Sequence, residues 1–124
     1  MNPKAKGDRA ETRAKKELET AGFLVERAHG IPVWVAPGRC ISKHHDFWSV
    51  FDLVGLRHDA IRFVQVTAAD DHLKEKRDRI DDLEDYLPKM RGVSFELWYW
   101  MERKGWRKWV RYGGPCKWVE TTTR

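Results

Sequence analysis

Apolar and polar residues alternate through residues 51–67, and this stretch gives the clearest pattern in the chain. The runs FDLVGL and AIRFVQVT, separated by a polar turn around residues 57–60, predict two strands joined as a hairpin. Polar side chains stand at the strand ends, with Asp52 in the first strand and Gln65 and Thr67 in the second. Their carboxylate, amide and hydroxyl oxygens could together hold a divalent cation. The same residues also suit the fraying ends of two ordinary strands.

Helical periodicity appears on both sides of these strands. Residues 3–21 repeat apolar positions at intervals of three and four, with Pro3 in the first turn and Gly22 after the end, which predicts a first helix. Residues 70–87 predict a second helix on the same grounds, with Asp70 as its N-cap and Pro88 beyond its end.

The remaining segments predict further strands. Residues 23–28 follow Gly22 as a strand, and SFELWYWMER and GWRKWVRYG predict a hairpin around Lys104 and Gly105. Residues 29–49 form a long connection broken by prolines, in which residues 31–36 could be a short edge strand. Residues 1–6 and 119–124 are expected to be frayed. The expected fold class is therefore mixed α/β, with four to five strands flanked by helices in the order αβββαβ plus a C-terminal strand.

Length and composition indicate one folded domain over residues 1–124. The apolar share of 41% and the seven tryptophans argue against a disordered chain, and the length permits a real core. No apolar run is long enough to cross a bilayer and no signal-like segment is present, so a soluble cytoplasmic protein is expected. Cys40 and Cys116 are far apart without a CxxC pattern, which favours free thiols over a zinc site.

The charge distribution favours a polyanionic partner without establishing one. Lys and Arg exceed Asp and Glu by 24 to 19. In the second helix the early turns are basic (Lys74, Lys76, Arg77 and Arg79) and the late turns acidic, which is the reverse of what the helix dipole favours. An anionic ligand near the start of the helix would explain this order, and so would chance surface charge.

The long connection carries Arg39, Lys43, His44 and His45. Adjacent residues of an extended chain point to opposite faces, so His44 and His45 are poorly placed to ligate one metal ion. Contact with a phosphate backbone is the favoured interpretation of this basic group.

Glu11 borders the apolar stripe of the first helix. The favoured interpretation is a surface charge paired with Lys15 four residues later, and the alternative is a carboxylate that reaches over the sheet towards Asp52. In the C-terminal hairpin, tryptophans interleaved with cations suit nucleic acid or a dimer interface. The chain has no Walker loop, GxGxxG, nucleophile elbow or HExxH.

Three short motifs occur in a fixed order. They are Gly7-Asp8-Arg9-Ala10-Glu11 with Gly22-Phe23, then Phe51-Asp52-Leu53-Val54, then Phe63-Val64-Gln65-Val66-Thr67 about a dozen residues after Asp52. With this order of elements, residues 7–87 resemble the PD-(D/E)xK nuclease superfamily and, within it, the archaeal-type Holliday junction resolvases. The resemblance implies a restriction-endonuclease-like core.

In that superfamily two acidic side chains and an intervening carbonyl hold Mg²⁺, and a lysine positions or activates water. The resemblance therefore implies Asp52, Gln65, the Val66 carbonyl and Glu11 as ligands of Mg²⁺ or Mn²⁺. The chain departs from the pattern where Gln65 replaces a glutamate, which removes a charge and weakens metal binding. It also departs where Thr67 replaces the catalytic lysine, because a hydroxyl cannot supply an ammonium group. Lys74 and Lys76 of the following helix are the candidate substitutes, with Arg77 and Arg79 behind them.

The implied function is a metal-dependent endonuclease that hydrolyses phosphodiester bonds in branched DNA, a Holliday junction resolvase of DNA recombination and repair. Arg9, Arg13 and Lys15, with the basic loop, would hold flanking phosphates. A homodimer is implied, with the tryptophan hairpin as the expected interface; no membrane and no small-molecule cofactor are expected. The insertion at residues 30–49 departs from the family and leaves substrate geometry open.

Two other functions remain open. One is a catalytically impaired, structure-selective DNA-binding protein on the same fold, because Gln65 and Thr67 could mark a disabled site. The other is a protein-interaction module that uses the tryptophan hairpin. Metal-dependent cleavage would separate the first from a nuclease, and near-zero DNA affinity at low salt would favour the second.

Overall fold

The structure is a computed structural model that describes residues 3–28, 30–36, 39–44, 47–48, 50–112 and 117–123, with the backbone alone for residues 3–4, 30–36, 39–44 and 122–123. The described elements are α1 (Pro3–Thr20), β1 (Leu24–Arg27), β2 (Gly30–Ala36), β3 (Arg39–His44), β4 (Leu53–Arg57), β5 (Ala60–Thr67), α2 (Leu73–Asp81), the short 3₁₀ helix η1 (Glu84–Tyr86), β6 (Val93–Met101), β7 (Gly105–Tyr112) and β8 (Trp118–Thr123).

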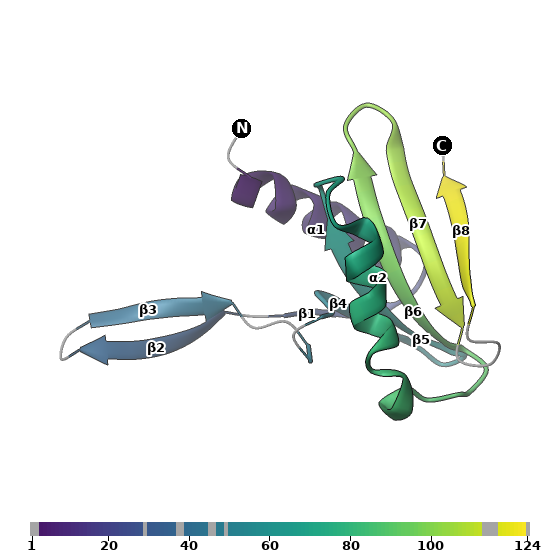
Figure 1. Ribbon diagram of the computed structural model, residues 1–124, viewed down its shortest axis with the longest axis horizontal. Coiled ribbons are helices and arrows are strands. Elements are labelled where there is room, and N and C mark those ends of the chain that lie inside the picture. Colours follow the sequence, from purple (N-terminus) through teal and green to yellow (C-terminus); the bar gives the residue numbers. More distant parts are fainter. Residues whose placement is uncertain are drawn as a thin grey trace.

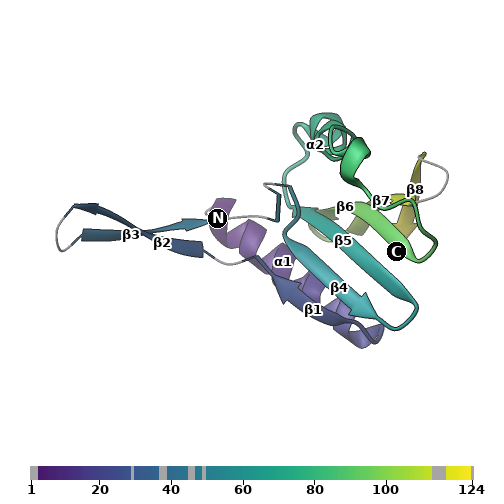
Figure 2. The same cartoon turned by 90° about the horizontal axis from the view of Figure 1, so that it is seen from below.

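A six-stranded mixed sheet organises the described chain, in the order β1-β4-β5-β6-β7-β8 (Figure 1). Strands β5 and β6 are parallel and are linked through α2, while the other neighbours are antiparallel. Strands β2 and β3 pair with each other in a separate sheet that extends away from the main one in both views (Figures 1 and 2). The expected mixed α/β class is confirmed, with six strands in the main sheet rather than four or five.

The two helices cover opposite faces of this sheet (Figure 2). On one face, α1 packs its small and apolar residues against alternate positions of the strands; this cluster contains Ala10, Ala14, Leu18, Phe23, Val25, Leu53, Val64, Trp98 and Trp106. On the other face, Ile80 of α2 packs with an aromatic cluster that includes Phe51, Phe63 and Phe95. The period of two in β5 therefore sorts Val64 to the α1 face and Phe63, Gln65 and Thr67 to the α2 face. No α-helix in the described ranges is long and apolar enough to cross a membrane.

The second helix is shorter than the periodicity predicts. It begins at Leu73 rather than Asp70, because His72 occupies the N-cap in a left-handed conformation with φ of 60° and no side-chain cap. The α-helix ends at Asp81, and Leu83 and Leu87 reach the aromatic cluster from either side of η1 instead.

The C-terminal segment forms β8, although the sequence predicts a frayed end there. Trp118 to Thr123 pair with β7, and the Trp118 indole donates a hydrogen bond to Asp81 at 2.9 Å. Arg107 of β7 also forms an ion pair with Glu120 of β8 at 2.6 Å. The strand follows β7 closely in sequence, but its residues WVETTT lack a clear alternation of apolar and polar positions, which is why local patterns miss it.

The tryptophan hairpin lies inside the molecule. Strands β6 and β7 occupy the interior of the sheet, and Trp98, Trp106 and Trp109 are buried. These three side chains are covered by the fold of one chain, so they are not exposed for contact with a second copy. The homodimer and the hairpin as its interface stay predictions.

A buried ion pair fixes the middle of the α1 face. Glu96 is 1% exposed and accepts two hydrogen bonds from the Arg62 guanidinium, at 2.7 and 2.8 Å. The Ser94 hydroxyl and the Trp98 indole also donate to its carboxylate. Burial alone would raise the pKa of Glu96, but the hydrogen bonds and charge of Arg62, with Ser94 and Trp98, hold this pKa below its usual value.

The lowered pKa predicts a pH-dependent cost for Glu96→Gln. Removing the charge leaves Arg62 without its partner, and we expect the free energy of unfolding at pH 7 to fall by about 2 kcal/mol, less than for a fully buried pair because Arg62 is partly exposed. Since the folded pKa lies below the unfolded one, this contribution is present above the unfolded pKa of about 4.3 and is lost as the pH falls through the folded pKa. Urea unfolding between pH 7 and pH 2 measures it.

The matched control is Glu120→Gln, whose pair with Arg107 is exposed. We expect that variant to lose less than about 1 kcal/mol at pH 7. Equal losses in the two variants, or a loss in Glu96→Gln that does not shrink as the pH falls below the unfolded pKa of about 4.3, would contradict the assignment.

Candidate active site

Asp52 is the residue directly before β4, and it lies beside the end of β5. Its N–H donates to the Val64 carbonyl at 2.9 Å, although Leu53 is the ladder partner of Val64. Asp52 is a bend residue directly before β4, and this hydrogen bond ties it to β5. The Asp52 Oδ2 accepts a hydrogen bond from the Val66 N–H at 2.7 Å, and the residue is 7% exposed. The carboxylate is therefore held beside the end of β5.

Gln65 lies one residue before Val66 and faces α2 together with Phe63 and Thr67. Its Oε1 is buried and accepts no hydrogen bond from the described residues. Leaving such an acceptor unsatisfied costs about 1–3 kcal/mol, so native structures seldom tolerate one without a reason. A cation bound beside Asp52 would satisfy this oxygen.

Lys76 brings an ammonium group to the same place. Its Nζ donates to the Thr67 Oγ1 at 3.3 Å, and the Ala69 N–H donates to the same oxygen at 3.2 Å. Helix α2 crosses the end of β5 and carries Lys76 over it. Lys74, two residues earlier, instead forms an ion pair with Asp78 at 3.3 Å and is 79% exposed. Of the two predicted substitutes for the missing lysine, the structure brings Lys76 to Thr67 and leaves Lys74 on the outer surface of α2.

Glu11 lies on α1 and hence on the other side of the sheet. It is 8% exposed, and its carboxylate forms an ion pair with Arg27 of β1 at 2.5 Å. The expectation of a surface charge paired with Lys15 is wrong, because Glu11 adjoins the buried Ala10 and faces β1, where Arg27 can reach it. Asp8 lies 3.6 Å from the same guanidinium. Glu11 is thus already neutralised by a cation of the protein.

Where the structure describes their side chains, the predicted phosphate contacts are divided between α1 and α2, on opposite faces of the sheet. On α1, the Arg13 guanidinium stacks 4.1 Å from the Trp100 ring centroid, while Arg9 is exposed and Lys15 partly buried. On α2, the Arg77 guanidinium lies 4.6 Å from the Trp109 ring centroid and Arg79 is exposed. The side chains of Arg39, Lys43, His44 and His45 lie outside the described residues.

Tyr99 joins the site without any local signal in the sequence. It is the ladder partner of Thr67 across the parallel pair β5–β6, so both side chains face α2. Burial and the nearby carboxylate of Asp70 raise the pKa of the Tyr99 hydroxyl, which remains a proton donor at neutral pH. The alternation within β6 identifies the face of Tyr99, but only the register of the parallel pair places it opposite Thr67.

The donor set fits a weakly held divalent cation. In the ranges for which side chains are placed, no three His, Cys, Asp or Glu residues gather as ligands. Asp52 and the unpartnered Gln65 Oε1 offer the oxygen donors that Mg²⁺ and Mn²⁺ prefer. Glu11 does not fit this set, because Arg27 holds its carboxylate.

Comparison with models of protein families, with curated proteins and with solved structures finds no match to this chain. The functional conclusions below therefore depend on the site itself.

The lack of a charge on Gln65 is expected to limit the affinity of the site for a divalent cation. Gln65→Glu adds a second carboxylate beside Asp52, so we expect Mn²⁺ to bind at least about tenfold more tightly than to wild type, by isothermal titration calorimetry. Without metal the two carboxylates repel each other, so the melting temperature of this variant should fall and recover when Mn²⁺ is added.

Two variants complete this test. Asp52→Asn should abolish Mn²⁺ binding, and Glu11→Gln should leave the Mn²⁺ dissociation constant unchanged, because Glu11 is held by Arg27. A Gln65→Glu variant that binds Mn²⁺ no better than wild type would exclude residue 65 as a ligand.

Proposed function

We propose that this protein is a metal-dependent endonuclease that hydrolyses phosphodiester bonds in DNA. The observation that carries the proposal is the position of the Lys76 Nζ, 3.3 Å from the Thr67 Oγ1 at the end of β5. The same strand end holds the buried Asp52 carboxylate, bonded to the Val66 N–H, and the Gln65 Oε1, which accepts no hydrogen bond from the described residues. An ammonium group and oxygen donors at one strand end are a suitable arrangement for stabilising a phosphate during hydrolysis. The resemblance of residues 7–87 to the PD-(D/E)xK nucleases supports the same activity.

Each side chain has a distinct role in this proposal. Asp52 and Gln65 would hold a divalent cation, which would supply Lewis-acid polarisation of the scissile phosphate and of a water molecule. Lys76 places its positive charge against the phosphate oxygens and compensates for the absence of a lysine at position 67. Thr67 positions Lys76 by accepting its hydrogen bond. Water forms the new bond to phosphorus, the bond to the 3′-oxygen breaks, and that oxygen leaves with a proton.

Branched DNA is the proposed substrate class, and a homodimer the proposed assembly. Both follow from the likeness to Holliday junction resolvases, since a junction must be cut in two strands by two sites. The basic early turns of α2 favour an anionic backbone close to Lys76 and Arg77.

A second function, structure-selective DNA binding without cleavage, is favoured by one specific observation. Among the described residues proposed as metal ligands, only Asp52 contributes a carboxylate to this strand end, because Gln65 is neutral and Glu11 is paired with Arg27. A site with so little negative charge could hold DNA through its cations and never load a metal.

Cleavage of a labelled four-way junction and of a matched linear duplex, with Mg²⁺, Mn²⁺ or EDTA, tests the proposal. We expect metal-dependent cuts by wild type and none by Asp52→Asn. The cleavage rate of Lys76→Ala should fall by about 10²-fold or more, the loss typical of removing one charge-stabilising group. Lys74→Ala is the matched control, because it removes the same group from the same helix at an exposed position. Its rate should stay within about twofold of wild type.

The outcomes separate the two functions. Equal losses in Lys74→Ala and Lys76→Ala would mean that the lysines act through general DNA affinity, and the assigned role of Lys76 would be wrong. Tight binding of the junction with no cutting under either metal would replace the nuclease by a structure-selective binder. Cleavage of the linear duplex at the rate of the junction would retain the nuclease and reject branched DNA as its specific substrate.

A further inference from the structure

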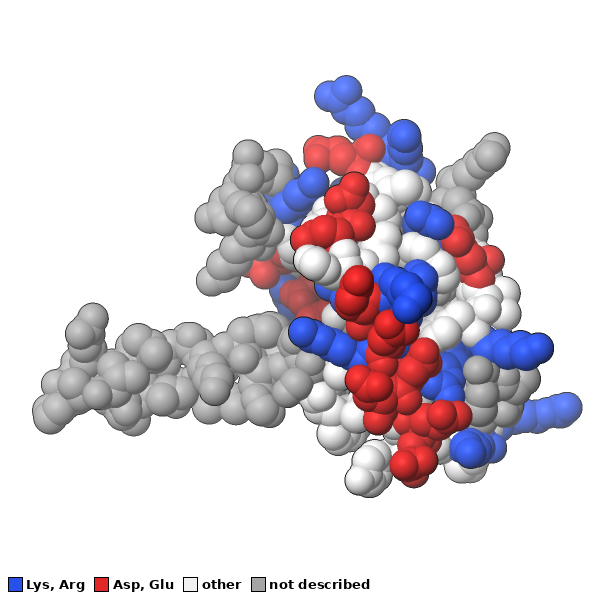
Figure 3. All heavy atoms as spheres, viewed as in Figure 1, with Lys and Arg blue, Asp and Glu red and all other residues white. Residues whose placement is uncertain are grey.

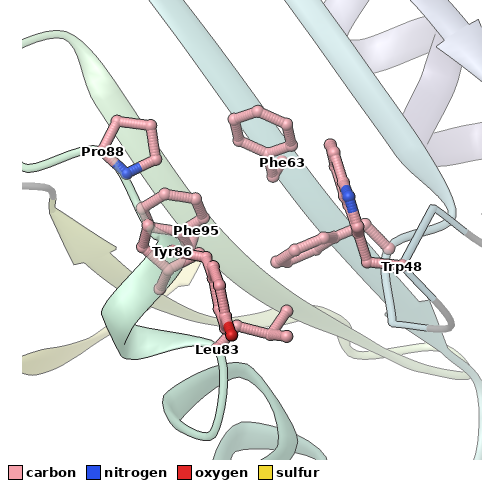
Figure 4. A pocket seen from close by; sticks show the side chains of 8 residues that line it. Trp48, Phe63, Leu83, Tyr86, Pro88 and Phe95 are labelled. Carbon is pink, nitrogen blue, oxygen red and sulfur yellow. The ribbon is translucent and has the colours of Figure 1, made fainter.

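An apolar pocket opens on the α2 face of the sheet, next to the candidate active site but separate from it. Its volume is about 440 Å³, and it is lined by Trp48, Phe51, Phe63, Leu83, Tyr86, Leu87, Pro88 and Phe95 (Figure 4). Phe51 adjoins Asp52 in sequence, and Phe63 lies two residues before Gln65 on the same face of β5. A pocket of this size and lining is typical of a binding site for an apolar group.

Two large aromatic side chains of the pocket are left exposed. Trp48 is 65% exposed and Tyr86 is 85% exposed. Trp48 also has a φ of 52°, a left-handed conformation that is unfavourable for a bulky side chain. Its indole nevertheless lies against Phe63, with ring centroids 5.7 Å apart. A strained residue that presents an aromatic ring at the mouth of a pocket is more often found at a functional surface than at an inert one.

Carboxylates outnumber cations among the sequence neighbours of the lining residues. Asp82, Glu84 and Asp85 adjoin the lining residues Leu83 and Tyr86 in sequence, and with Asp81 they are called the acidic rim, whereas Lys89 follows the lining residue Pro88. Carboxylates gather over the lower part of α2 and below it in the space-filling view (Figure 3).

The acidic rim is only partly neutralised. Arg111 donates to Asp81 at 2.7 Å and to Glu84 at 3.2 Å. Among the residues whose side chains the structure describes, Asp82 and Asp85 have no ion-pair partner and are exposed. Phosphate groups would be repelled there, so the pocket is unsuited to the DNA of the proposed nuclease, whereas Lys and Arg side chains would be attracted.

We propose that this pocket is the docking site of a basic protein segment. The segment inserts aromatic or aliphatic side chains between Trp48, Phe63 and Tyr86, and its Lys or Arg residues face Asp82 and Asp85. The acidic rim favours a basic partner, because a purely apolar ligand would gain no binding energy from these carboxylates. The cations of α2 then serve the candidate active site, and the carboxylates that follow the helix, Asp82 and Asp85, serve the partner. The inference goes beyond the nuclease and does not depend on it.

A peptide selection tests this inference. The immobilised full chain is used to select from a random library of 12-residue peptides, and an enriched sequence is synthesised with a fluorescent label. We expect enriched peptides to combine an aromatic or Leu anchor with a net positive charge, and their binding, followed by fluorescence anisotropy, to weaken as salt is added.

Variants then locate the peptide on the surface. Trp48→Gly removes the indole while allowing the left-handed φ, and Tyr86→Ala removes an exposed ring; each should weaken the peptide at least tenfold without lowering the melting temperature. Asp82→Lys with Asp85→Lys should weaken it at least tenfold, whereas Glu19→Lys with Glu102→Lys, the same charge change at exposed sites elsewhere, should change it less than about threefold.

The contrary results are equally definite. No enrichment, enrichment of acidic or uncharged apolar peptides, or binding unchanged by Trp48→Gly would each overturn the proposal. Self-association of the unliganded chain that is abolished by Trp48→Gly would also overturn it, because a second copy would then be the occupant. Junction cleavage is assayed in parallel; its presence or absence decides the nuclease and leaves the peptide result unaffected.

Discussion

The parallel pairing of β5 and β6 is the constraint on which the rest of this structure depends. Two parallel neighbours cannot be joined by a tight turn, so the chain must cross from one end of the sheet to the other. In this protein the crossover contains α2 and η1 and lies over one face of the sheet (Figure 2). The start of the crossover leaves β5 immediately after Thr67, which brings Lys76 back over that strand end. Its later part covers Phe63 and Phe95 and forms one wall of the apolar pocket.

The opposite face supplies the rigidity that the site requires. Trp98 and Trp106 belong to the cluster that packs against α1. Their two rings are in T-shaped contact with each other, with centroids 5.3 Å apart. The Arg62–Glu96 pair joins β5 to β6 on this face, so the two strands that carry Thr67 and Tyr99 are linked by side chains as well as by their ladder. Charges buried in this way require complete hydrogen bonding to be tolerated, and Ser94 and Trp98 complete it.

Local sequence patterns predict much of this fold, because they arise from the burial of one face of each helix or strand. The apolar period of α1 and the alternation of β4 and β5 follow from burial on one face, so their positions agree with the sequence within a few residues. The opposition of Tyr99 and Thr67 depends on the register between segments far apart in sequence, which no local pattern contains. β8 pairs with the strand just before it, but its residues lack the apolar alternation that would predict a strand. The left-handed His72, which starts α2 late, is likewise decided by the path of the crossover.

The candidate site shows the same division. Asp52, Gln65 and Thr67 are found from the sequence because polar residues at the ends of apolar strands are unusual. The choice between Lys74 and Lys76 depends on the rotation of α2 about its axis, which is set by the packing of Ile80 against the aromatic cluster. The ion pair that holds Glu11 could not be predicted from the sequence, because its partner Arg27 lies on β1 and no local pattern links the two residues.

The charge order of α2 and η1 is best understood as a consequence of their position over two different surfaces. The reversed order expected for one helix over residues 70–87 holds only in part for the helix that forms. Within α2, Glu75 in the first turn and Arg79 in the last turn are favoured by the dipole, whereas Asp81 and the C-cap Asp82 are not. Glu84 and Asp85 lie beyond the helix, in η1. Each unfavourable charge costs only a few tenths of a kcal/mol at an exposed position. The crossover can therefore carry cations near the candidate site and carboxylates beside the apolar rings at little cost to the stability of α2.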